Sequence, residues 1–308
     1  MTSIQIPASA VELRTETARS ALAMTGRAAV AFGSLFVVAG SVIVARAFVG
    51  GTQGMHAPRV IVAVCGSLFA LAGSWVSVNG ALDLRRKRIA RERAAATPAQ
   101  PWWWDYSWSA EGIGNDSRRQ IAMAFATTLF IALFLVPFHW IGIAAKDAPR
   151  IFLVFALMFD LVVIGLLARA VRLVMMRRRY GASWLRFGHF PFLAGEQLDA
   201  SLDAVGGLAS IDRLTATLQC VQERYETRGS GKNRSTQVVC YALWSETKTV
   251  ERGKRGTFDF SFTPPADAPG SALSERPARF WELVLTSDDV PGVDYAATFL
   301  VPVYPSKR

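Results

Sequence analysis

Four long apolar runs constrain the fold of this 308-residue chain more than any other feature of its sequence. Residues 28–45, 60–82 and 121–145 carry no charged side chain, and residues 151–168 carry only Asp160. Eighteen helical residues span about 27 Å, which is close to the thickness of the hydrocarbon layer of a bilayer. Because a backbone in lipid has no water to bond with, each run is predicted to form a transmembrane helix.

The segments that join these runs differ in their basic residues. The N-terminal tail, the segment between the second and third runs and the exit of the fourth hold 16 Lys and Arg together, whereas the other two loops hold four. Positive residues favour the cytoplasmic side of a membrane. We therefore predict that both termini and the middle segment are cytoplasmic, and that Cys220 and Cys240 are reduced thiols there.

The net charge of +10 belongs to the apolar part of the chain. Residues 1–180 hold 20 Lys and Arg against 9 Asp and Glu, whereas residues 181–308 hold 14 against 15. A nucleic-acid-binding protein carries its basic residues on a soluble face, whereas these arginines flank apolar runs. No nucleic-acid partner is predicted.

The first two runs contain a near-repeat, GSLFVVAGS at 33–41 and GSLFALAGS at 66–74. Its glycines are seven residues apart and share one helix face, where small residues let two transmembrane backbones approach closely. We expect the first two helices to form a tightly packed hairpin. A dimerisation face and an old duplication are the alternatives.

Asp160 is the acidic residue inside the fourth run. A carboxylate at the centre of a bilayer costs a few kcal/mol, so its side chain is expected to face protein or water. One interpretation is a proton or cation relay. The other is a neutral or hydrogen-bonded carboxyl that holds two helices together, for example through a Ser or Thr, and the scarcity of further polar residues in the runs favours it.

The middle segment, residues 83–120, begins with basic residues and continues as PWWWDYSW at 101–108. Tryptophan favours the headgroup region, and a basic cluster attracts anionic lipid. We predict that this segment lies on the membrane surface or packs under the C-terminal domain, through Arg85, Arg86, Lys87, Arg88, Trp102, Trp103, Trp104 and Trp108.

The remaining residues, 177–308, show strand patterns and almost no helical ones. Phe258, Phe260 and Phe262 alternate with polar residues and are predicted to share one buried face. About seven strands without helices favour a β-sandwich. They are expected at 183–188, 197–203, 214–221, 236–244, 257–262, 279–287 and 296–304, with a hairpin turn at 227–235 and an irregular segment at 264–271.

We find no catalytic, metal-binding or cofactor-binding pattern. The cysteines form no CxxC pair, and the three histidines lie far apart in the sequence. GSGK at 229–232 lacks the first glycine of a phosphate-binding loop, and no G-x-S-x-G surrounds a serine. The chain is therefore predicted to have no cofactor and no enzymatic activity.

Several stretches resemble an uncharacterised family of bacterial inner-membrane proteins: PWWWDYSW, residues 178–202 and 258–271, and above all the terminal PG-x-DY-x-x-x-F-x-VPVY. The loop departs from the family pattern at Asp105, where a basic residue is expected, and at Ser107, where an acidic one is. The resemblance implies four transmembrane helices, a Pro-Trp-rich loop, an arrestin-like β-sandwich and an inner-membrane location. It implies no activity. The last motif comprises Pro291, Gly292, Asp294, Tyr295, Phe299, Pro302, Val303 and Tyr304.

The predicted architecture is therefore a four-helix membrane part followed by an all-β domain with an arrestin-like or immunoglobulin-like sandwich. The leading functional hypothesis is a membrane-anchored scaffold whose β domain binds unidentified proteins, with the bilayer as a further partner and a homo-oligomer left open. The alternative is a small channel or transporter that uses Asp160. The predicted segments are a tail (1–27), hairpin 1 (28–82), the basic Trp-rich loop (83–120), hairpin 2 (121–176) and the cytoplasmic β domain (177–308).

Overall fold

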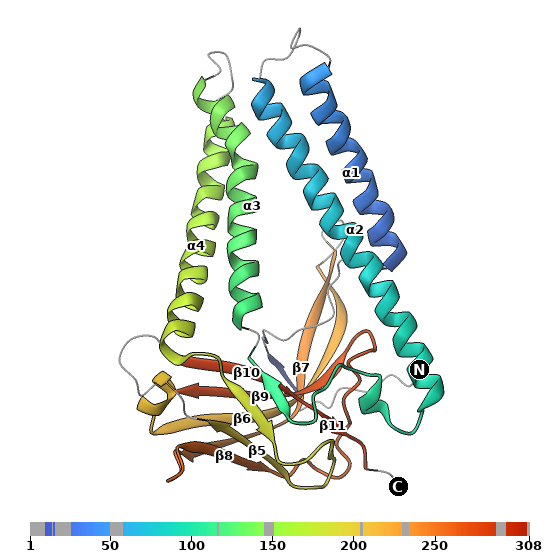
Figure 1. Cartoon of the computed structure of the whole chain (residues 1–308), viewed down its shortest axis with the longest axis vertical. Helices are drawn as coiled ribbons and strands as arrows, with labels where there is room; N and C mark the ends of the chain where they lie inside the picture. Colours follow the sequence, from blue (N-terminus) through green and yellow to red (C-terminus); the bar gives the residue numbers. More distant parts are fainter. Residues whose placement is uncertain are drawn as a thin grey trace. The chain divides into compact units, whose positions relative to one another are not determined.

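The chain divides into two compact units (Figure 1). The helical unit comprises Ala23–Arg86 and Ser117–Val174, and the β unit comprises Met1–Leu22, Lys87–Asp116 and Met175–Arg308. The β unit thus includes two segments from outside the predicted β domain. The computed structural model describes residues 10–13, 15, 26–49, 58–115, 117–144, 151–203, 206–229, 234–287 and 294–306.

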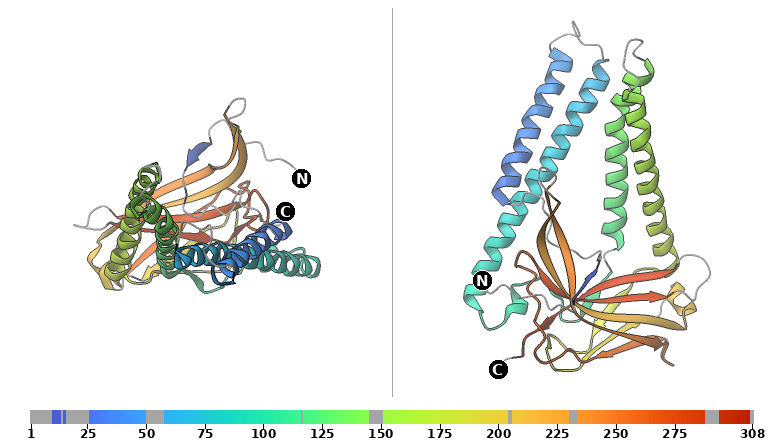
Figure 2. Two further views of the ribbon diagram at one scale, coloured as in Figure 1. Left: turned by 90° about the horizontal axis from the view of Figure 1, so that it is seen from above. Right: turned by 180° about the vertical axis from the view of Figure 1, so that it is seen from behind.

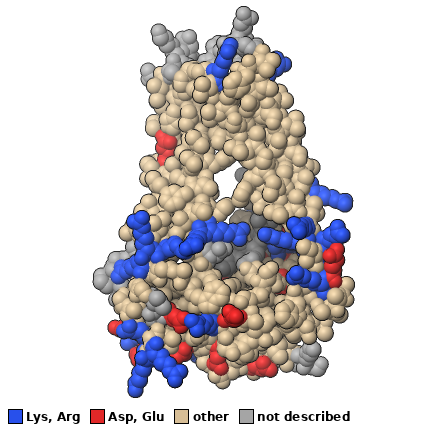
Figure 3. Space-filling view, viewed as in Figure 1, with Lys and Arg blue, Asp and Glu red and all other residues tan. Residues whose placement is uncertain are grey.

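Helices form at all four apolar runs, as predicted. Each is long and apolar enough to cross a membrane, and the space-filling view shows few charged side chains on the helical unit between its ends (Figure 3). The membrane-type helical part is confirmed. The helices are α1 (Gly26–Val49), α2 (Arg59–Ala96), α3 (Ser117–Ala144) and α4 (Ile151–Tyr180).

Two helices continue past their apolar runs into basic sequence. Helix α2 reaches Ala96, so residues 83–96 of the predicted loop are helical, and α4 reaches Tyr180. Arginine, lysine, glutamate and alanine are strong helix formers, and Arg88 and Glu92 form an ion pair one turn apart at 2.9 Å. The first part of the predicted loop, residues 83–96, is thus helical, because a lack of apolar residues ends a membrane span without ending a helix.

Helices α1 and α2 pack through their glycines. A Cβ atom placed on Gly40 would lie 2.4 Å from the carbonyl oxygen of Gly66, and one placed on Gly73 would lie 2.5 Å from that of Gly33. Only glycine permits this approach of the two backbones. The predicted hairpin is confirmed, and Figure 2 shows α1 running beside α2 and α3 beside α4.

The β unit contains a five-stranded sheet, ordered β1-β7-β6-β9-β10, and a four-stranded sheet, ordered β2-β3-β5-β8. A short parallel pair joins β4, early in the C-terminal sequence, to β11 near its end. All other pairings are antiparallel. The strands among the described residues are β1 (Val11–Leu13), β2 (Gly112–Gly114), β3 (Trp184–Phe187), β4 (Phe192–Leu193), β5 (Leu198–Asp203), β6 (Arg213–Arg228), β7 (Ser235–Glu251), β8 (Thr257–Phe262), β9 (Arg279–Ser287), β10 (Tyr295–Val301) and β11 (Val303–Tyr304).

Both sheets contribute to one hydrophobic core. Phe258, Phe260 and Phe262 of β8 lie in it with Trp281 and Leu283 of β9, and all five side chains are buried. The alternation predicted for β8 is therefore correct, and burial of this aromatic surface stabilises the unit. The predicted two-sheet sandwich is confirmed.

Most predicted strands appear with small shifts in their bounds. The predicted strand at 296–304 is divided into β10 and β11 by Pro302, which has no N–H for a sheet hydrogen bond. The predicted strands at 214–221 and 236–244 are parts of the much longer β6 and β7. Residues 230–233 of the predicted turn between them, and Pro291 and Gly292 of the terminal motif, lie outside the described residues.

Candidate functional site

The Trp-rich loop is built into the β unit by Asp105. Its carboxylate is 7% exposed and accepts hydrogen bonds from the backbone N–H groups of Leu273, at 2.9 Å, and Ser274, at 2.7 Å. It also accepts one from the hydroxyl of Tyr304 at 3.2 Å. Bonds to an ionised acceptor are stronger than bonds between neutral groups. Asp105 therefore holds the loop between α2 and α3 against two separate segments of the C-terminal sequence.

The hydrogen bonds at Tyr304 have a defined direction. The indole N–H of Trp108 donates to the hydroxyl oxygen of Tyr304 at 2.8 Å, which leaves the hydroxyl proton for Asp105. Burial raises the pKa of Tyr304, and the charge of Asp105 raises it further. The hydroxyl thus stays protonated and acts as a fixed donor rather than as an acid.

The predicted tryptophans occupy different environments. Trp102 makes an edge contact with Tyr304, with ring centroids 5.9 Å apart, and Trp104 donates to the carbonyl oxygen of Thr97 at 3.3 Å. Trp103 is 54% exposed and touches Phe190 at 6.2 Å between centroids. Packing thus brings Trp102 and Trp108 to the Asp105 site, and the membrane-surface role of this segment stays a prediction.

The predicted basic cluster does not join the Asp105 site. Arg85, Arg86 and Arg88 are exposed on α2, and Lys87 is half-buried. The Arg88–Glu92 pair is highly exposed, with side-chain exposures of 83% and 61%, and an exposed pair of this kind contributes only tenths of a kcal/mol. The attraction of these four residues to anionic lipid stays a prediction.

Asp160 contacts His139 of the neighbouring helix α3. The distance from Oδ2 of Asp160 to Nε2 of His139 is 2.9 Å, and Nδ1 of His139 lies 3.0 Å from the carbonyl oxygen of Leu135. Because a carbonyl only accepts, Nδ1 carries a proton, and a single further proton is shared between His139 and Asp160. The pair has no net charge whichever partner holds that proton. The hydrogen-bonded carboxyl expected here has a histidine partner rather than a Ser or Thr.

Strands β6 and β7 extend beyond their neighbour β9. Strand β6 pairs with β9 only over Thr215–Gln222, so its remaining residues pair with β7 alone. We call this extension, Glu223–Arg228 with Ser235–Cys240, the β arm. Tyr225 on the arm is 42% exposed. Sequence patterns missed the arm because QERYETR has the charge content of a loop.

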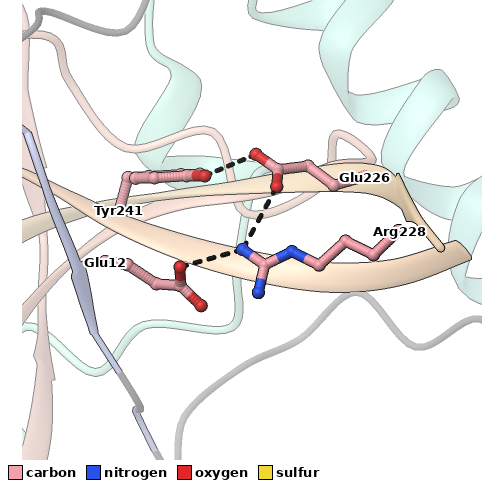
Figure 4. Close-up of polar contacts among 4 residues, drawn as sticks. All are labelled: Glu12, Glu226, Arg228 and Tyr241. Atoms are coloured by element: carbon pink, nitrogen blue, oxygen red, sulfur yellow. Dashed lines mark hydrogen bonds and ion pairs between the residues drawn. The ribbon is translucent and has the colours of Figure 1, made fainter.

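The N-terminal strand β1 lies along the outer edge of β7. Its Val11, Glu12 and Leu13 pair with Ala242, Tyr241 and Cys240. Figure 4 shows polar side chains around this edge: Glu12 of β1 contacts Arg228 of β6, and Glu226 of β6 contacts both Arg228 and Tyr241 of β7. A three-residue strand within a tail of mixed composition has no distinguishing sequence pattern, so the tail was predicted only as a tail.

Two further groups bear on chemistry. Burial raises the pKa of Cys220 to about 12, and burial followed by the charge of Glu223 raises that of Cys240 to about 11, so neither thiol is a ready nucleophile. Among the described residues, no three His, Cys, Asp or Glu side chains are placed to hold a metal ion.

Comparison with known proteins gives a likeness in structure but none in sequence. No family model matches the sequence, and no curated protein matches it. The crystal structure of Spo0M, a sporulation control protein from Bacillus subtilis, is similar with a TM-score of 0.26 and 18% sequence identity. The match covers 40% of this chain and 49% of Spo0M, so the chain spans about half the length of that protein.

Proposed function

We propose that the chain is a membrane-anchored interaction protein, without a catalytic reaction, whose β-sandwich binds a partner protein. One observation carries the proposal: the sandwich takes strands from three places in the chain. Strand β1 precedes α1, β2 lies between α2 and α3, and β3 follows α4. A binding domain attached to its membrane segments at more than one point is held more firmly than one on a single linker, and β2 and β3 keep two such attachments when β1 is displaced.

The same pairing supports the proposed topology. Strand β1 is hydrogen-bonded to β7, and β2 is hydrogen-bonded to β3, which supports a topology in which the three segments share one side of the membrane. Sixteen basic residues on that side against four on the other favour the cytoplasm. We propose a bacterial inner-membrane location with both termini cytoplasmic.

Site-specific photocrosslinking in intact cells tests the interaction function. A photoreactive phenylalanine replaces Tyr225 on the β arm, and the control replaces Trp184 of β3, which is equally exposed at 43% against 42%. We expect a discrete crosslinked protein from position 225 and none from 184. The same adducts from both positions, or none from either, would contradict the proposal.

The second candidate is a proton or cation pathway, which the Asp160–His139 pair favours. Asp160→Asn removes the acidic partner and keeps the shape of the side chain. In proteoliposomes, a coupled flux that is lost in Asp160→Asn and retained in Asp259→Asn, a substitution in β8, would establish this function. If the native chain and both variants all gave only background flux, this transport function would be excluded.

A further inference from the structure

The β7 edge already carries a strand from elsewhere in the sequence. Glu12 lies 216 residues from Arg228, yet its carboxylate accepts a hydrogen bond from that guanidinium at 2.8 Å. Backbone pairing with Cys240, Tyr241 and Ala242 sets the register of β1. Addition of an extended segment to an exposed sheet edge is a general mode of peptide recognition, in which the backbone supplies affinity and side chains supply specificity.

The side chains around β1 define what the edge recognises. Arg228 donates both to Glu12 and, at 3.3 Å, to Glu226, which in turn accepts from Tyr241 at 2.5 Å (Figure 4). Glu226 therefore fixes the guanidinium where it meets an acidic residue on the added strand. The hydrogen bond with Glu12 raises the pKa of Arg228, whose charge is permanent.

Leu13 supplies the apolar half of the recognition. It packs against a buried cluster on the face of the five-stranded sheet, with Cys240, Val221, Phe280 and Leu300. Beyond it, the Thr15 hydroxyl donates to Glu282 at 2.9 Å. The edge thus selects an acidic residue followed directly by a branched apolar one.

Strand β1 is held weakly for a strand of a folded sheet. It has three residues, and Val11 is 67% exposed. The Glu12–Arg228 ion pair joins side chains that are 53% and 44% exposed, so water screens it. Short, exposed edge elements open at a small fraction of the free energy of global unfolding.

We propose that the β7 edge is a strand-addition site that β1 occupies in the resting chain, and that an extended partner segment with an acidic–apolar pair displaces β1 to bind there. This inference rests on the proposed interaction function and names its site and the chemistry of its ligand. The acidic residue of the partner must contact Arg228, and its apolar residue must pack where Leu13 packs in the resting chain. The apparent affinity of the edge for the partner segment is its intrinsic affinity multiplied by the fraction of chains in which β1 has left the edge.

The test uses the full-length chain in detergent and a fluorescent peptide copy of residues 9–16, SAVELRTE. In Leu13→Cys the new thiol lies opposite Cys240 in the strand register, so oxidation can form a disulfide that holds β1 on β7, and reduction breaks it. By fluorescence anisotropy, we expect the reduced variant to bind the peptide at least tenfold more tightly than the oxidised one. In the control Leu13→Cys with Cys240→Ala, which cannot form this disulfide, peptide binding should change little on oxidation.

Two variants are expected to differ in their affinity for this peptide. Glu12→Ala weakens the resident strand, so this chain should bind the native peptide a few-fold more tightly than the native chain does. Glu12→Ala with Arg228→Ala removes the recognition site as well and should lose that gain. A purely structural role for the ion pair predicts no gain in either variant.

Several results would overturn the inference: equal binding by the oxidised and reduced chains, no binding by either, or no disulfide between positions 13 and 240. An intermolecular disulfide with a dimeric chain would show that the occupant is a second copy and would also overturn it. Failure here with a positive crosslink at Tyr225 leaves the proposed function in place and moves the site elsewhere on the β unit.

Discussion

The helical unit and the β unit bury opposite kinds of residue. In α1 and α2 the buried positions are mainly glycine and alanine, such as Gly33, Gly40 and Gly66, while Leu35 is 64% exposed. In the β unit the largest fully buried side chain is Trp281. Lipid is as apolar as leucine, so helices gain from close backbone contact rather than from burying large side chains, whereas a soluble sheet gains by removing them from water.

The largest effect is expected from Trp281→Ala in the β unit. Its ring is fully buried, and its indole N–H donates to the carbonyl oxygen of Pro269 at 2.9 Å. The loss should lower the free energy of unfolding of the β unit by about 3–5 kcal/mol. Pulse proteolysis of the full chain in detergent and urea measures it. Leu35→Ala on α1 should change stability by less than about 0.5 kcal/mol, and equal losses would erase the contrast between the units.

Asp105→Asn tests the attachment of the Trp-rich loop. An asparagine oxygen can accept from Leu273, but its amide group would turn two donors toward the N–H of Ser274. We expect a loss of about 1.5–3 kcal/mol, because the bonds to the carboxylate are weakened and the N–H of Ser274 loses its acceptor. Limited proteolysis at the loop measures it. Asp267→Asn, at an exposed turn, should leave cleavage unchanged.

Gly40→Ala tests backbone contact in the helical unit. The added methyl group meets backbone atoms of α2 on two sides, Gly66 and Ala70, so the helices must separate at a cost of about 1–3 kcal/mol. Gly165→Ala in α4 meets nothing within 4 Å and should be neutral or stabilising by up to about 1 kcal/mol. Thermal unfolding in detergent compares the two variants. Equal behaviour would show that the glycines of α1 carry no packing role.

The free energy of unfolding of the β unit should be nearly constant around neutral pH and should fall progressively above pH 9. Burial raises the pKa of Cys220 from 9.0 to about 12. Above pH 9 the unfolded chain loses this proton while the folded chain keeps it, so the free energy of unfolding falls as pH rises, by at most about 1.4 kcal/mol per pH unit up to the folded pKa. Cys220→Ala should show a shallower slope between pH 9 and 12, and an identical slope would exclude the thiol as its source.

Sequence patterns were most informative where one physical constraint dominates. Length and apolarity predicted α1–α4, and alternation predicted the buried phenylalanines of β8. They failed where the deciding contacts are distant in sequence. Asp105 was noted only as a departure from a family pattern, because its partners Leu273 and Tyr304 are 168 and 199 residues away. Glu12 and Arg228 were missed for the same reason.

The central claim is that the tail, the Trp-rich loop and the C-terminal sequence form one sandwich on one side of a membrane. Exposed cysteines at Val11, Trp103 and Tyr225, introduced one at a time, test it with a membrane-impermeant thiol reagent on sealed vesicles of both orientations. We predict labelling at all three positions in inside-out vesicles and at none in right-side-out ones. Labelling of any one position from the opposite side to the others would contradict the account.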